Sequence, residues 1–283
     1  MRWAHCVVLL MFCSFAQGQE YLQLDFPSAV ATMLLAIDRE GDVVGEFRTR
    51  TGRRYGFLLD TEGVFRTIDV GGSIDTRPSG INLHGSVAGS YQDGDGQQHG
   101  FLLQRGEFTT IDYPEAVHTR GLGINGRADI VGRYEDAVGR LHGFFLRHGN
   151  FTVIDYPEAL QTASRGINNY GVVVGRYVDT TQVAHGFVLS DDEFTVIDVP
   201  GAMETRAAGL NGRGDVVGSY EDAEGIHGFL LRRGTFVTIE FPEAIATTAT
   251  GINDDGTIVG YFQDTAEQIH GFVLEGQSVT SEP

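Results

Sequence analysis

Short stretches of alternating apolar and polar residues recur along this chain, each followed by residues that favour turns. In one representative unit they cover residues 119–125, 129–136, 142–146 and 151–155. Alternation with a period of two predicts β-strands with one buried face, and the Asn- and Gly-containing stretches between them predict short turns. Pro157 ends the fourth stretch, because proline has no N–H for a strand ladder. Each unit therefore predicts four strands, here called a, b, c and d.

The unit repeats along nearly the whole chain with a period of about 43 residues, which is typical of β-propeller blades. Six sets of strands a to c begin near residues 31, 75, 118, 161, 204 and 246. A first strand d, residues 22–26, precedes the first set, and the last set, residues 247–274, lacks a full strand d. We expect 22–26 to complete the last blade, since closure removes the open edges of a linear array.

The sequence thus predicts an all-β, six-bladed propeller of four-stranded blades whose ring is closed by the N-terminal strand. A β-solenoid of the same units is the alternative, and the tail at residues 278–283 is a competing strand d. Residues present in every unit are expected to serve the blade. Gly123 and its copies on strand a lie where a Cβ would clash near the axis. The phenylalanines of strand c form the expected core between blades: Phe57, Phe101, Phe144, Phe187, Phe229 and Phe272.

Four of the six units carry a Gly-Ile-Asn phrase, and five carry a His-Gly-Phe motif such as His142-Gly143-Phe144. Over nearly all of residues 20–275 this resembles the extracellular tandem repeats built around a His-Ala-Phe motif followed by Ile-Asn-x-x-Gly-x-Val-Val-Gly. The middle residue is Gly here instead of Ala. The resemblance implies an extracellular β-rich array and assigns no activity, because a fold does not carry a function by itself.

The first 18 residues are expected to be a signal peptide. Arg2 precedes an apolar run of about ten residues that is too short to span a bilayer, and Ala16-Gln17-Gly18 fits a cleavage site. The alternative is a buried first helix. A signal predicts a secreted or periplasmic protein with one domain, residues 19–283. Both cysteines, Cys6 and Cys13, lie in the signal, so the mature chain has no disulfide and no Cys-based metal site.

The formal net charge is −18, and all twenty basic residues are arginine. This balance opposes binding to nucleic acid or anionic membranes, because both attract basic proteins. The lack of lysine excludes Schiff-base chemistry and a P-loop. The expected partner is a small anionic molecule, a carbohydrate or a protein. No cofactor is expected, and the protein is expected to be a monomer.

Five histidines each follow an aspartate by five or six residues across the predicted b–c hairpin. These pairs recur symmetrically and do not converge on one point as metal ligands must. We therefore expect structural carboxylate–imidazole pairs and no metal site. The first unit has Thr49 and Tyr55 in place of both partners, as expected if the two residues pair. The five pairs are Asp93–His99, Asp136–His142, Asp179–His185, Asp222–His227 and Asp264–His270.

Residues that break the repeat are the better candidates for function. Arg77, Arg120 and Arg206 occupy one variable position near the start of strand a, and Arg165 lies two positions further along in its unit. Converging guanidinium groups would bind carboxylate, sulfate or phosphate through paired hydrogen bonds. His118, beside Arg120, is the candidate for proton transfer. The alternative is that the arginines neutralise carboxylates on the same loops, namely Glu115, Glu158, Glu204 and Glu243.

Two functions are compatible with this pattern. The first is a binding module for a small anionic or carbohydrate ligand, or a partner, on the face of the d–a and b–c loops, since ligand-binding residues favour longer loops on a rigid scaffold. The second is a lyase or hydrolase acting on a uronate-like polysaccharide or a carboxylate substrate at the channel mouth. The sequence does not decide between a binding protein and an enzyme.

Overall fold

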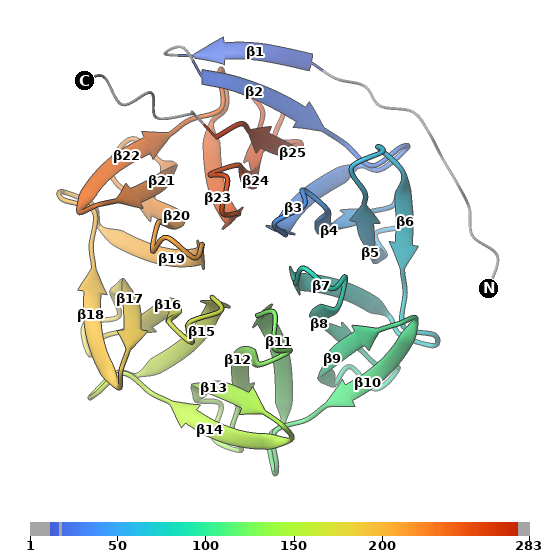
Figure 1. Ribbon diagram of the computed structural model, residues 1–283, viewed down its shortest axis with the longest axis vertical. Coiled ribbons are helices and arrows are strands. Elements are labelled where there is room, and N and C mark those ends of the chain that lie inside the picture. The colour runs from blue at the N-terminus through green and yellow to red at the C-terminus, as the bar shows by residue number, and fades with distance from the viewer. Residues whose placement is uncertain (1–11, 17–18, 277–283) are drawn as a thin grey trace.

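The computed structural model describes residues 12–16 and 19–276, and its strands form six blades around a central axis (Figure 1). Blades one and two contain β3 (Ala31–Ile37), β4 (Val43–Arg48), β5 (Arg54–Leu59), β6 (Phe65–Ile68), then β7 (Asp75–Ile81), β8 (Val87–Gln92), β9 (Gln98–Gln104), β10 (Glu107–Ile111). Blades three and four contain β11 (His118–Ile124), β12 (Ile130–Glu135), β13 (Leu141–Arg147), β14 (Asn150–Ile154), then β15 (Gln161–Ile167), β16 (Val173–Val178), β17 (Ala184–Ser190), β18 (Glu193–Ile197). Blade five contains β19 (Glu204–Leu210), β20 (Val216–Glu221), β21 (Ile226–Arg232) and β22 (Thr235–Ile239), and blade six begins with β23 (Ala246–Ile252), β24 (Ile258–Gln263) and β25 (Ile269–Leu274).

The ring closes through the N-terminal strand, as the strand count predicts. The strand β2 (Gln19–Leu24) pairs antiparallel with β25, with Leu22 opposite Val273, and so becomes the fourth strand of blade six. The strand lies slightly N-terminal to the predicted 22–26. The closed six-bladed ring excludes the solenoid alternative. The competing tail, residues 278–283, lies outside the described residues.

One further strand, β1 (Phe12–Ala16), pairs with the outer edge of β2. It falls within the predicted signal peptide, of which residues 1–11 and 17–18 lie outside the described residues. The signal therefore stays a prediction, and its removal would leave β2 as the outermost strand, like the fourth strand of every other blade. In the described ranges no helix is long and apolar enough to cross a membrane.

Each blade is an antiparallel meander whose first strand is nearest the axis (Figure 1). In blade three the register sets Arg120 opposite Arg133 and Tyr134 opposite His142. Every first strand also contains one register shift at the same place, which in β11 lies between Gly121 and Gly123. The pattern of alternation did not predict this bulge. The bulge decides which side chains enter the channel.

The core lies between the blades, in the place predicted for the strand c phenylalanines. All six are completely buried. Glycines permit the close approach that this packing needs: a Cβ on Gly132 would lie 2.6 Å from the Phe144 ring. Nearer the axis, a Cβ on Gly123 would lie 3.1 Å from the Cα of Gly166 in the next blade. The first strands therefore crowd around the channel as expected, which leaves a rigid wall for a site.

Candidate functional site

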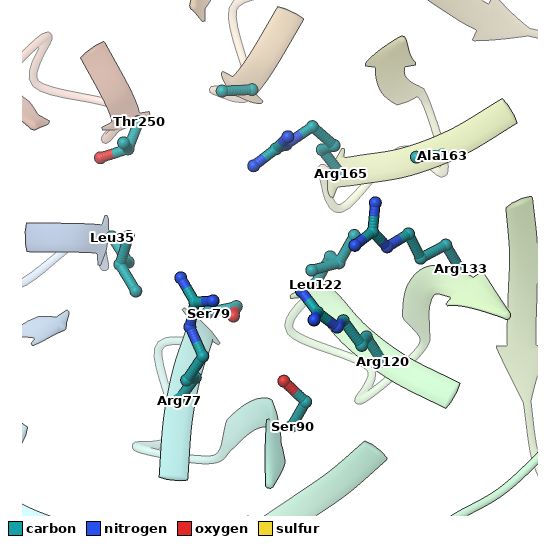
Figure 2. Close-up of a pocket in the computed structure, with 11 residues that line it drawn as sticks. Leu35, Arg77, Ser79, Ser90, Arg120, Leu122, Arg133, Ala163, Arg165 and Thr250 are labelled. Atoms are coloured by element: carbon teal, nitrogen blue, oxygen red, sulfur yellow. The ribbon is translucent and has the colours of Figure 1, made fainter. Parts of the chain in front are cut away.

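A cavity of about 230 Å³ is enclosed by the first two strands of the blades, and the side chains of four arginines point into it (Figure 2). They are Arg77, Arg120, Arg133 and Arg165, and all four are half-buried. The rest of the wall is small and either apolar or hydroxyl-bearing, and consists of Leu35, Ser79, Ser90, Leu122, Ala163, Ala208 and Thr250. Positive charge is thus concentrated on blades two to four.

The β-bulges aim one residue of each blade into this cavity. The residue skipped by the register shift in β11 is Leu122, and in β15 it is Arg165. All six skipped residues line the cavity: Leu35, Ser79, Leu122, Arg165, Ala208 and Thr250. A bulge re-aims a side chain that regular alternation would direct elsewhere. In the sequence, Arg165 stands out only because this residue breaks the repeat.

Two of the arginines lie directly opposite each other on neighbouring strands. Arg120 on β11 and Arg133 on β12 are register partners, an arrangement of like charges that destabilises a sheet. Burial, together with the charges of Arg120 and Arg165, lowers the pKa of Arg133 to about 9. Burial and Arg77 likewise lower the pKa of Arg120. The fold thus concentrates mutually repelling charges at this point.

The protein supplies few acids to offset this charge. Glu46, which is only 4% exposed, contacts Arg77, and Gln98 accepts a hydrogen bond from Arg120. Arg133 and Arg165 have no hydrogen bond or ion pair with any described residue. Burial, together with the charge of Arg176, lowers the pKa of Arg165 to about 10. An anion in the cavity would supply the missing counter-charge.

The fourth predicted arginine, Arg206, does not line the cavity. It pairs with Glu204 on its own strand and lies 3.9 Å from Glu221, so it is neutralised locally, as the alternative interpretation expects. That interpretation does not extend further, because the other three proposed carboxylates are exposed and form no ion pair with a described residue: Glu115, Glu158 and Glu243.

His118 also lies outside the cavity lining. Its Nδ1 accepts a hydrogen bond from the backbone N–H of Gln98 at 3.1 Å. The cavity arginine that was not predicted is Arg133, which occupies the Gly-Arg-Tyr phrase of strand b, as Arg176 does in the next blade without lining the cavity. The sequence did contain a signal for Arg133, because its position holds four residue types among the six blades and so breaks the repeat as the position of Arg77 does. The six residues are Glu46, Ser90, Arg133, Arg176, Ser219 and Tyr261.

The repeated histidines form a separate array away from the axis. Each Nε2 lies 3.2–3.6 Å from the predicted aspartate of the b–c hairpin. Each Nδ1 lies 2.7–3.0 Å from a second carboxylate that the sequence analysis did not pair with it. These second partners directly follow the fourth strand in five of the blades and are Asp112, Asp155, Asp198, Glu240 and Asp25. Each imidazole therefore bridges two loops.

Blade one keeps the bridge with a different cation. Asp69 occupies the position of the second carboxylate, and Arg53 Nη2 binds it at 3.0 Å. The guanidinium carbon of Arg53 lies 4.3 Å from the centre of the Tyr55 ring, the residue that replaces histidine. Arg53 thus makes the contact with the second carboxylate in the blade where Thr49 and Tyr55 replace the Asp–His pair. In the described part of the chain, no group of three or more His, Cys, Asp or Glu is placed to hold a metal ion.

No protein-family model matches this chain, and no curated protein sequence matches it, so the resemblance to the His-Ala-Phe repeats stays a prediction. Solved structures do match. They include AofleA from Arthrobotrys oligospora (13% identity, TM-score 0.58, 93% of this chain and 92% of that chain) and the SapL1 lectin in complex with α-methyl fucoside (10%, 0.58, 90% and 98%). The fucose-specific lectin from Aleuria aurantia matches at 11% identity and a TM-score of 0.52, over 90% and 100% of the two chains. At these identities the likeness establishes the fold, and the Aleuria aurantia lectin is described as a six-bladed β-propeller.

Proposed function

We propose that this protein is a binding module whose central cavity holds a small anion. The observation that carries the proposal is that Arg133 and Arg165 enter the cavity without an acidic partner among the described residues, in a chain with 38 acidic residues. Burying unpaired charges of one sign is costly, and a bound anion would remove that cost. Arg77 and Arg120 lie near the starts of their strands, so the ligand would enter from the face of the d–a and b–c loops.

Thermal unfolding in the presence of anions tests this function. Sulfate, phosphate and citrate should each raise the melting temperature above that in chloride of equal ionic strength, because a ligand that binds only the folded state stabilises it. The Arg133→Ala and Arg165→Ala variants should lose this response. Arg50→Ala is the matched control, since Arg50 is exposed and forms no hydrogen bond or ion pair with another described residue. Equal responses in all four proteins would refute an anion site in the cavity.

Carbohydrate is the second ligand class that we carry forward. It is supported by the likeness of fold to lectins that were solved with fucosides or described as fucose-specific. Calorimetric titration with α-methyl fucoside tests this ligand class. A heat of binding that persists in the Arg133→Ala variant would assign the sugar to a site outside the cavity. The lyase or hydrolase alternative gains no support from the geometry, because His118 does not reach the cavity.

We further propose that the protein is exported to the periplasm or the extracellular medium and acts there as a monomer, without nucleic acid or membrane partners. The N-terminal apolar run and the acidic composition support this. N-terminal sequencing of the exported protein should begin at residue 19.

A further inference from the structure

Two of the cavity arginines are held from behind in the same way. The Nε of Arg77 contacts Glu46, and the Nε of Arg120 donates to the side-chain oxygen of Gln98. In both cases the supporting residue comes from the preceding blade, and neither arginine forms another hydrogen bond or ion pair with a described residue. The terminal Nη1 and Nη2 groups are therefore free, and they point into the cavity (Figure 2).

This geometry suits carboxylates. The two terminal nitrogens of a guanidinium form a planar fork that grips the two oxygens of a carboxylate at once. Holding Nε fixes the plane of the fork before the ligand arrives, which reduces the entropy lost on binding. Arg77 and Arg120 occupy the same repeat position in adjacent blades, so the cavity contains two such forks side by side around the axis.

The remaining wall indicates a ligand with a carbon skeleton. Leu35, Leu122, Ala163 and Ala208 present apolar surface to the cavity. Ser79 and Ser90 line it on blade two, and their hydroxyls have no hydrogen-bond partner among the described residues. An inorganic anion would leave the apolar side without contacts. At about 230 Å³ the cavity is smaller than the pockets of drug-sized ligands, which begin at roughly 300 Å³.

We infer that the cavity takes a small organic dicarboxylate, with one carboxylate on Arg77 and the other on Arg120. Glu46 and Gln98 act as positioning residues for the two forks, and Arg133 and Arg165 supply further positive charge. This inference rests on the proposed anion-binding function and deepens it by naming the class of ligand.

Calorimetric titration of the chain that begins at residue 19 tests the ligand class, with glutarate, acetate and inorganic phosphate as probes at low ionic strength. We expect glutarate to bind at least tenfold more tightly than either other probe. Acetate or phosphate binding as tightly as glutarate would overturn the dicarboxylate inference while leaving the anion site intact. Absence of binding by all three would instead overturn the proposed function itself.

Substitutions at Arg120 and Gln98 distinguish binding that needs the planar guanidinium fork from binding that needs only positive charge. Arg120→Lys keeps the charge but not the fork, so glutarate affinity should fall about tenfold while phosphate affinity changes much less. Gln98→Ala should weaken glutarate binding in the same selective way, and Gln98→Glu, which restores an acceptor for Nε, should recover it. Arg50→Lys should change neither affinity. Equal losses for glutarate and phosphate in Arg120→Lys, or no recovery in Gln98→Glu, would contradict the positioning role.

Discussion

At the scale of the residue, the five bridging histidines show how one side chain can join two loops in each blade. His142 lies 2.7 Å from Asp155 and 3.3 Å from Asp136, and its ring stacks on Tyr134 with centroids 4.9 Å apart. An imidazole lies between two carboxylates in five blades, and in blade one Arg53 binds the single carboxylate Asp69. An imidazole loses its charge near neutral pH, which makes these bridges sensitive to pH.

We expect the free energy of unfolding to be largest at mildly acidic pH. The hydrogen bond from His99 lowers the pKa of Asp93 below its usual 3.8, so the contribution of that carboxylate is present above pH 3.8 and is lost as the pH falls through the lowered value. Burial opposes protonation of His99, but its bonds to Asp112 and Asp93 outweigh burial and raise its pKa above 6.5. Its contribution is complete below pH 6.5 and is lost as the pH rises through the raised value.

Urea unfolding at a series of pH values checks this window, which spans about pH 4 to 6.5. His99→Gln should flatten the alkaline side of the profile relative to the unmodified protein. His84→Gln is the matched control, because His84 is exposed and its side chain forms no hydrogen bond or ion pair within the described part of the chain. Superimposable alkaline limbs for His99→Gln and the unmodified protein would contradict the prediction.

At the scale of the element, the innermost strands combine close packing with a bulge. A Cβ at Gly123 would lie 2.7 Å from the carbonyl oxygen of Arg165 and 3.1 Å from the Cα of Gly166. Both contacts are with backbone of the next blade, which cannot yield as a side chain can. The same crowding fixes the neighbouring bulge residue, so the shape of the cavity depends on these glycines.

Gly123→Ala should therefore destabilise the protein by about 1–3 kcal/mol, the usual cost of overpacking. It should also weaken anion binding, because Arg165 would be displaced. Gly71→Ala should change stability by less than about 0.5 kcal/mol, since no atom lies within 4 Å of a Cβ at Gly71 and its φ is not in the left-handed region. Denaturant midpoints of the two variants give the comparison, and equal midpoints would refute the crowding argument.

Most strand positions could be predicted from alternation, and the observed bounds in blade three differ from the predicted ones by one residue or so. The bulges could not, for a physical reason. In residues 119–125 the bulge is flanked by Gly121 and Gly123, which carry no side chain to mark the phase of the alternation. Variation at its position in strand b marks Arg133 in the sequence, but whether its side chain enters the channel is shown only by the observed register with Arg120.

At the scale of the whole molecule, the number of blades and the closure followed from counting, because each blade repeats the same core positions. The site did not follow in the same way. Arg77, Arg120 and Arg165 stand out by breaking the repeat, but Arg206 breaks it equally and is neutralised by Glu204, which only the fold reveals. Convergence of side chains from three blades depends on ring geometry, and one repeat unit does not contain that information.

Closure also predicts how truncation acts. A chain that begins at residue 25 lacks β2, so β25 loses its partner strand and the buried side chains of Tyr21 and Leu24 are removed. Each such side chain contributes about 1.5–3 kcal/mol, so the melting temperature should fall sharply. A chain that begins at residue 19 lacks only the segment containing β1 and should melt close to the full-length protein. Thermal unfolding followed by circular dichroism compares the three chains. Blade six contains strands from both ends of the sequence, β2 and β25, so loss of β2 opens the ring. Equal melting temperatures of the chains beginning at residues 19 and 25 would show that the ring does not depend on β2.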